Sequence, residues 1–177
     1  MWKRTNRNVE CNVFHTKKNS CDSNVDNWSK NTSVFNERIL GKKQLTFLIE
    51  DTDGEKFGYY LNTEVVKKYD GRQKTDSKSF HFNLQSKNNR LKQPMKFEIK
   101  DLKKGGYQLY EKSEYLNLIT LGDVYLNKEN KKNGSHCYQN ESDFDYHGIK
   151  NALCGKEPNS YGYMNFTPNR ILVIQMK

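Results

Sequence analysis

Cysteine and histidine are the residues of this chain best suited to metal binding or nucleophilic chemistry, and most of them gather in two stretches. The first stretch holds Cys11, His15 and Cys21, and the second holds His136, Cys137, His147 and Cys154. Structural zinc sites pair such ligands at C-x₂₋₄-C or H-x₃₋₅-H spacing. Neither stretch has this spacing, so we expect ordinary core cysteines and surface histidines, and no bound metal.

A cysteine nucleophile needs a histidine base within hydrogen-bond reach and a third group that orients the base. The candidates are Cys137 or Cys154 with His136 or His147. Successive residues of a strand point to opposite faces, so His136 is badly placed to serve Cys137. His147 is free of this objection, but the sequence indicates no orienting third group. A thiol that responds to oxidant is the alternative, since it needs only exposure and a basic neighbourhood.

Carboxylates and glycines indicate no stronger chemistry. The segment D-T-D-G at 51–54 has its glycine too early for a calcium loop, and Asn62 stands where such a loop requires glutamate. The acidic pairs Asp51–Asp53 and Asp143–Asp145 fit turns better than the two carboxylates of a glycosidase. No G-x-G-x-x-G, G-x-x-x-x-G-K or G-x-S-x-G motif occurs. We therefore predict no catalytic residue, no cofactor, and a protein that works by binding.

A formal net charge of +9 makes a lysine-rich nucleic-acid or polyanion-binding module the alternative function. Most of the positive charge is lysine, whereas arginine is favoured for bidentate contacts to phosphate and guanine. The lysines also occur as scattered pairs, at positions 17–18, 42–43, 67–68, 103–104 and 131–132. We therefore expect nucleic-acid binding that is weak and unspecific.

At 177 residues the chain has the length of one ordinary domain. Residues 1–22 are polar and lack periodicity, so we interpret them as a flexible leader before a domain at 23–177. No apolar run approaches the ~18 residues of a membrane span, and no secretory signal follows the basic start. We expect a cytoplasmic protein, with the nucleus as the alternative, that does not insert into a membrane and keeps its thiols free.

A short helix and a hairpin are predicted near the start of this domain. Apolar residues of segment 33–40 recur at the spacing of one helical face, with Thr32 or Ser33 as the cap and Gly41 as the left-handed residue after the helix. The dipeptide Asp53–Gly54 lies between two strand-like runs. It predicts a two-residue hairpin turn in which both residues have positive φ.

Two later segments alternate apolar and polar residues with a period of two. Their apolar members are Phe80, Phe82 and Leu84 in the first and Met95, Phe97 and Ile99 in the second. We expect these apolar faces to be buried. Segments 107–110 and 115–126 add two or three strands, and the apolar run 171–176 predicts a central closing strand. The predicted fold is mainly β: a two-sheet antiparallel sandwich with a few short helices.

The order of these segments resembles the TLDc domain family, especially its divergent protist versions, over about residues 23–177. Residues that match the family's motifs are Asp53, Gly54, Phe57 and Gly58 in a DTDG-x-x-FG hairpin, Phe80, Phe82 and Leu84 in an F-x-F-x-L strand, and, more loosely, Gly134, Ser135 and Cys137 in a G-x-S-x-x-C region. The chain departs from the family in having only Gly122 of a glycine-rich run and in lacking the closing tryptophan.

The resemblance implies a β-sandwich without established catalytic machinery, in which the matching motif residues are structural. TLDc proteins are associated with resistance to oxidative stress and with binding the vacuolar proton-pumping ATPase. We therefore expect a non-catalytic interaction domain in the oxidative-stress response or at the proton pump. Its expected partners are proteins, with subunits of the pump as candidates.

Overall fold

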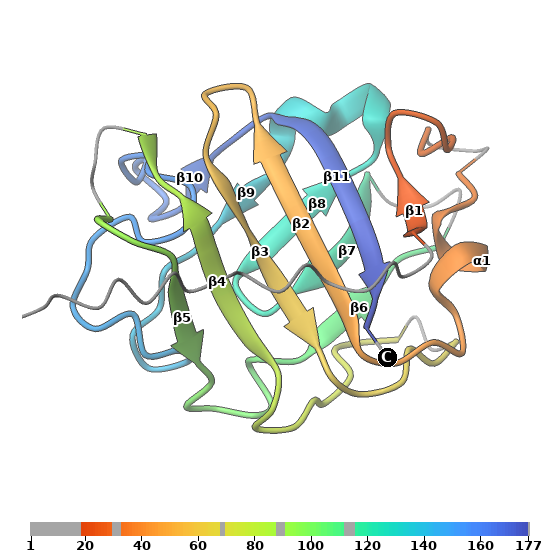
Figure 1. The fold of residues 1–177 in the computed structure, drawn as a ribbon, viewed down its shortest axis with the longest axis horizontal. Helices are drawn as coiled ribbons and strands as arrows, with labels where there is room; N and C mark the ends of the chain where they lie inside the picture. Colours follow the sequence, from red (N-terminus) through yellow and green to blue (C-terminus); the bar gives the residue numbers. More distant parts are fainter. Residues whose placement is uncertain (1–18, 30–32, 68–69, 88–90, 112–115, 177) are drawn as a thin grey trace, which may run out of the picture.

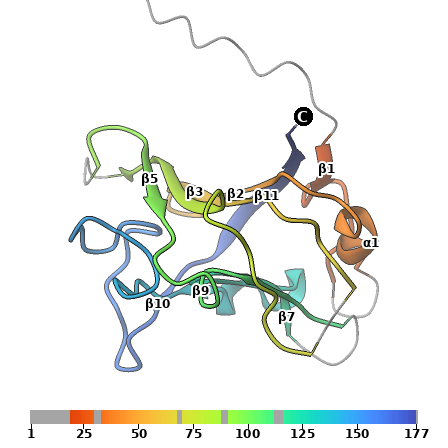
Figure 2. The same ribbon diagram turned by 90° about the horizontal axis from the view of Figure 1, so that it is seen from below.

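Two antiparallel sheets form the domain in the computed structural model, which describes residues 19–29, 33–67, 70–87, 91–111 and 116–176 (Figure 1). In spatial order the six-stranded sheet consists of β1 (Asn19–Asp22), β11 (Pro168–Gln175), β2 (Leu45–Asp51), β3 (Lys56–Leu61), β4 (Phe80–Gln85) and β5 (Met95–Glu98). The five-stranded sheet consists of β10 (Met164–Asn165), β9 (His136–Cys137), β8 (Val124–Asn127), β7 (Asn117–Leu121) and β6 (Tyr107–Leu109). The sheets lie as two layers (Figure 2), which confirms the predicted sandwich.

Two helices have their bounds within the described residues, α1 (Phe35–Ile39) and a 3₁₀ helix (Glu129–Gly134). At the start of α1 the Ser33 hydroxyl accepts a backbone N–H of the first turn at 3.2 Å, although the N-cap position itself belongs to Val34 and has no side-chain cap. The other predicted cap, Thr32, lies outside the described residues. Gly41 follows the helix with φ +71°, as predicted.

Strand β1 lies within the segment that the sequence assigned to a leader. It pairs antiparallel with β11, and Cys21 is buried in the core. Arg170 of β11 donates to the Asp22 carboxylate at 2.7 Å. The boundary predicted at residue 23 is therefore wrong, because the paired backbone already begins at Asn19. Strand β11 lies between β1 and β2, which confirms a closing strand inside its sheet.

The hairpin of β2 and β3 carries the Asp-Gly dipeptide as predicted, but its loop is longer than a two-residue turn. The N–H of Asp51 donates to the carbonyl of Glu55 at 3.1 Å, so Thr52, Asp53 and Gly54 form the loop. Positive φ is found at Gly54 (+86°) and not at Asp53, so that part of the prediction is wrong. The Asp51 carboxylate constrains the loop instead, since its Oδ1 accepts the N–H groups of Asp53 and Glu55, each at 2.9 Å.

Strand β4 turns its phenylalanines to the outer face and not to the core as predicted, although Phe82 is itself only 7% exposed because its ring lies over Gly58. His81 and Asn83 are 0% and 1% exposed on the inner face, whereas Leu84 on the outer face is 47% exposed. Phe80 and Phe82 pack against each other on the same outer face, with ring centroids 6.4 Å apart. The alternation of β4 was thus predicted correctly, but the buried face was not.

Backbone groups that need partners inside the sandwich explain why polar side chains of β4 point inward. The ring of His81 accepts the N–H of Asp123 at Nε2 (3.2 Å), so its Nδ1 carries the proton and donates to the carbonyl of Gly58 (3.2 Å). Asn83 donates to the carbonyl of Leu153 at 2.8 Å. Burial lowers the pKa of His81 to about 3, which keeps the ring neutral at pH 7. Because buried polar groups must be paired, His81 joins the two sheets through their backbones.

Fully buried side chains from both layers fill the space between the sheets. They include Phe47, Phe57, Tyr59 and Phe97 from the six-stranded sheet and Ile119, Leu121 and Leu126 from the five-stranded sheet. Across the part of the chain that the structure describes, no helix has both the length and the apolar character needed to cross a membrane.

Candidate functional site

A cavity of about 350 Å³ lies beside β8, where the β7–β8 turn meets the segment that follows β9. Its lining combines cations, carboxyl groups, amides and phenols and consists of Arg72, Lys104, Asp123, Tyr125, Tyr138, Gln139, Asn140, Asp143 and Gly162. These residues come from segments far apart in the sequence, which the sandwich brings together. The mixture of aromatic walls and a few polar groups is typical of binding pockets.

Asp123 is one of two buried carboxyl groups that line this cavity, the other being Asp143. Asp123 follows Gly122 in the two-residue turn between β7 and β8, where Gly122 has φ +51°. Its Oδ2 accepts the hydroxyl of Tyr146 at 2.9 Å and the N–H of Asn140 at 3.1 Å. Burial raises the pKa of Asp123 to about 6. The two hydrogen bonds lower the pKa, but their effect is smaller than that of burial. A carboxyl group that titrates near neutrality can exchange protons at physiological pH.

Arg72 is the cation that is fixed in the lining. Its guanidinium donates to the carbonyl of Lys104 and to the hydroxyl of Tyr125, the latter at 3.2 Å. A guanidinium has five donors in a rigid fork. These two bonds therefore orient Arg72 and leave it donors for an anionic group of a ligand.

Five aromatic rings form a cluster next to the cavity, which we call the aromatic surface: Tyr125, His136, Tyr138, Tyr161 and Tyr163. Tyr125 on β8 and His136 on β9 are direct cross-strand partners, and their rings stack at 4.7 Å with an interplanar angle of 11°. Tyr163 lies 4.7 Å from His136 and 5.8 Å from Tyr138. Tyr161 stacks on Tyr163 at 6.0 Å and is 79% exposed.

The outward direction of these rings follows from strand alternation. Val124 and Leu126 on β8 and Cys137 on β9 point into the core, so the intervening Tyr125 and the adjacent His136 point outward. Aromatic pairs directly opposite each other on neighbouring strands stabilise a sheet by ~0.2–1 kcal/mol. The first two rings of the aromatic surface are therefore placed by regular sheet geometry.

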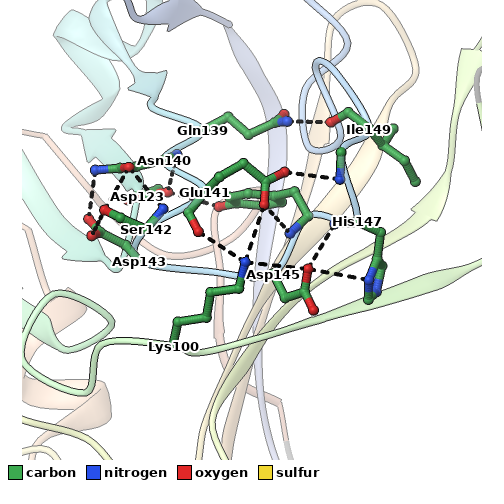
Figure 3. Close-up of polar contacts among 12 residues, drawn as sticks. Lys100, Asp123, Gln139, Asn140, Glu141, Ser142, Asp143, Asp145, His147 and Ile149 are labelled. Carbon is green, nitrogen blue, oxygen red and sulfur yellow. Dashed lines mark hydrogen bonds and ion pairs between the residues drawn. The ribbon is translucent and has the colours of Figure 1, made fainter.

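Segment 139–149 contributes Gln139, Asn140 and Asp143 to the cavity lining, and its own carboxylates hold its shape (Figure 3). Lys100 donates to the carbonyl of Glu141 at 3.1 Å and lies 3.5 Å and 3.6 Å from the carboxylates of Glu141 and Asp145. Asn140 donates to the Asp143 carboxylate at 3.2 Å. The acidic side chains of this segment thus fix its shape through contacts with their neighbours.

The structure separates the histidines of the second Cys/His stretch from its cysteines. His136 points to the outer face and His147 is exposed, whereas Cys137 and Cys154 are buried with their Sγ atoms 3.1 Å apart. His136 and Cys137 point to opposite faces of β9, as predicted. A direct approach of the two thiols was not predicted, because the spacing of 17 residues carries no motif.

Of the other Cys/His stretch, only Cys21 is among the described residues. Cys11 and His15 lie outside the described residues. Among the residues for which a structure is described, no group of three or more histidine, cysteine, aspartate or glutamate side chains is placed to hold a metal ion.

The residues that match the TLDc motifs are spread over the fold and do not form one site. Asp53 and Gly54 lie in the β2–β3 loop, Phe57 and Gly58 on β3, Phe80 and Phe82 on β4, Gly134 at the end of the 3₁₀ helix, and Cys137 on β9. Gly58 shows what such a residue does: a Cβ there would overlap the carbonyl of Phe47 and lie 2.8 Å from the Phe82 ring. Phe57 packs edge-on against Phe166 at 5.0 Å.

The sequence did not predict the roles of Asp123, Arg72 or the aromatic surface. Gly122–Asp123 between two apolar runs is a turn signal that places Asp123 at a strand end. Tyr161 and Tyr163 give no such signal, since their segment has no periodicity that fixes its direction.

Comparison of the chain with models of known protein families gave no match, and comparison with curated proteins gave none either. The structure defines the class of fold, a two-sheet antiparallel β-sandwich. A function can therefore be inferred only from the geometry of the cavity and the aromatic surface.

Proposed function

We propose that the chain is a non-catalytic interaction domain of the TLDc type and that the aromatic surface contacts its protein partner. One observation carries this proposal: rings from β8, β9 and segment 161–163 are packed into a single cluster outside the core. Tyrosine is enriched in protein interfaces because a rigid amphipathic ring covers a large area at low entropic cost.

The aromatic surface is largely ordered before any partner binds. Tyr125 is stacked on His136 and its hydroxyl accepts a hydrogen bond from Arg72. The Nδ1 atom of His136 also lies 3.1 Å from the carbonyl of Gly134. Side chains already fixed in one rotamer lose little entropy on association, which favours binding.

The class of partner follows from the resemblance to TLDc proteins. It indicates subunits of the vacuolar proton-pumping ATPase or proteins of the oxidative-stress response. The β-sandwich, and the close backbone approach of β2 to the motif residue Gly58, support the resemblance to TLDc domains.

Direct binding to the purified peripheral sector of the proton pump tests the proposal. Immobilised chain should bind the sector in biolayer interferometry, and the double variant Tyr161→Ala/Tyr163→Ala should raise the Kd at least about tenfold, as expected for loss of an aromatic interface anchor. Tyr60→Ala is the matched control, because Tyr60 lies half-buried on the outer face of the other sheet. Absence of binding by the wild type removes the pump as partner. Equal binding by the double variant removes the aromatic surface as its contact.

A second function, binding of single-stranded nucleic acid, is favoured by a specific observation. Arg72 and Lys104 line the cavity beside stacked rings, and cations next to aromatic platforms are how many proteins bind single strands. However, Asp123 and Asp143 line the same cavity, and carboxylates there would repel the phosphates of a nucleic acid. Several surface cations are also paired with carboxylates, as Lys96 is with Glu98 at 3.0 Å. We therefore place this function second.

A further inference from the structure

Two buried thiols lie almost in bonding distance inside the sandwich. The Sγ atoms of Cys137 and Cys154 are 3.1 Å apart, and both cysteines are free. Sulfur atoms of a disulfide are ~2.05 Å apart, so the pair needs to approach by only about 1 Å to bond. Their exposed fractions are 0% and 1%, which leaves the two sulfur atoms facing each other rather than solvent.

Each thiol is held in place by a different part of the fold. Cys137 belongs to β9, whose backbone pairs with β8 on one side and β10 on the other. Cys154 belongs to segment 151–155, where Asn83 of β4 donates to the carbonyls of the two preceding residues at 3.2 and 2.8 Å. Hydrogen bonds to the backbone therefore fix both chain segments and place the two sulfur atoms next to each other.

We propose that Cys137 and Cys154 are a modification site at which a peroxide forms a reversible intramolecular disulfide. In the first step one sulfur, as thiolate, attacks a peroxide oxygen, the O–O bond breaks, and the leaving hydroxide takes up a proton as water. The resulting sulfenic acid is attacked by the second sulfur, the S–S bond forms, and a second water leaves. Two thiols and one hydrogen peroxide thus give one disulfide and two waters, with two electrons passing from sulfur to oxygen.

Burial governs the rate of this reaction. The hydrogen bond between the thiols and their burial raise the pKa of Cys137 well above its ordinary value, so thiolate is scarce in the closed structure. Oxidation therefore proceeds through transient opening and is slower than for an exposed thiol. The same burial shields the product, so a dithiol reductant restores the thiols slowly. The bond would link segment 151–155 to β9, directly behind His136 of the aromatic surface.

Mass spectrometry of the full chain tests the modification without any substitution. The reduced protein is treated with hydrogen peroxide, its remaining thiols are alkylated in denaturant, and it is digested. We expect a peptide pair that joins Cys137 to Cys154 and is lighter by two hydrogens. Dithiothreitol should release the pair, and the oxidised chain should melt about 5–10 °C higher than the reduced chain.

Two single variants control the assignment. Cys21→Ser alters the other buried cysteine of the described residues, on β1, and should leave the cross-link unchanged. Cys154→Ala should abolish the cross-link and the rise in melting temperature. Sulfinic acid on either thiol without a cross-link, a cross-link that involves Cys21, or failure of the folded wild type to react with excess peroxide overturns the proposal. This test is independent of any partner, so its result leaves the proposed function unaffected.

Discussion

His81 and Asp123 are neighbours across the sandwich, and burial shifts their ionisation in opposite ways. The backbone N–H of Asp123 donates to the ring of His81, and burial lowers the pKa of His81 to about 3 while it raises the pKa of Asp123 to about 6. In both cases burial removes water from the group and so disfavours its charged form. Together they set how the free energy of unfolding depends on pH.

The two shifts act on stability with opposite sign. Between pH 3 and 6.5 the unfolded state binds more protons at His81 than the folded state does, so stability falls as pH falls through this range. Between pH 3.8 and 6 the folded state binds more protons at Asp123, so stability rises as pH falls. The contributions largely cancel from pH 6 to about 4.

Substitution of Asp123 by asparagine should remove this compensation. Asp123→Asn keeps the size of the side chain but cannot titrate, so only the contribution of His81 remains. We expect the free energy of unfolding to fall by about 2 kcal/mol more than in the wild type between pH 6 and pH 4, because burial raises the pKa of Asp123 from 3.8 to about 6. Urea denaturation at several pH values in this window measures it. Parallel pH profiles of wild type and variant would contradict the prediction.

At the scale of elements, the β2–β3 hairpin contains two glycines whose roles differ. Gly54 has φ +86° and nothing within 4 Å of a Cβ placed on it, whereas Gly58 has ordinary strand conformation but a Cβ there would overlap the backbone of Phe47. Gly54 is therefore required by backbone conformation and Gly58 by the close approach of β2 and the Phe82 ring.

Substitution of each glycine by alanine should distinguish the cost of a side chain at positive φ from the cost of steric overlap with β2. Gly54→Ala should lower the free energy of unfolding by about 1–2 kcal/mol, the cost of a side chain at positive φ. Gly58→Ala should lower it by about 3 kcal/mol or more, because β2 and β3 must move apart. Denaturant unfolding of both variants gives the comparison. A smaller loss for Gly58→Ala than for Gly54→Ala would show that the strands tolerate the methyl group.

These elements also show how far the sequence predicts the structure. Alternation located β4 and β5, and Asp-Gly located the hairpin, because these signals depend on residues close in sequence. The buried face of β4 was predicted wrongly, since His81 and Asn83 are drawn inward by backbone groups of the distant Asp123 and Leu153. The aromatic surface likewise depends on Tyr161 and Tyr163 meeting β9, a contact that no local pattern contains.

At the scale of the whole molecule, part of the positive charge behind the net charge of +9 is paired with carboxylates. Several cations are neutralised by nearby carboxylates, among them Lys100 by Glu141 and Asp145, Lys156 by Asp53, and Arg170 by Asp22. Lys128 is 1% exposed and donates to the carbonyl of Glu111 at 2.9 Å. Cations that are paired with carboxylates or buried contribute little to a continuous basic face. The net positive charge of the molecule still attracts phosphate.

Binding of nucleic acid should therefore be weak, strongly dependent on salt and indifferent to sequence. Labelled duplexes and single strands of varied sequence are titrated at ~50 and ~200 mM salt, a range over which phosphate contacts lose orders of magnitude in affinity. We expect all sequences to weaken together, because specificity requires base-edge contacts from a groove-fitting element. Tyr161→Ala/Tyr163→Ala should leave duplex binding unchanged, and a selective loss for single strands would assign base stacking to the aromatic surface. If one sequence keeps nanomolar binding at the higher salt while the others lose it, nucleic acid replaces the protein partner as the ligand of this domain.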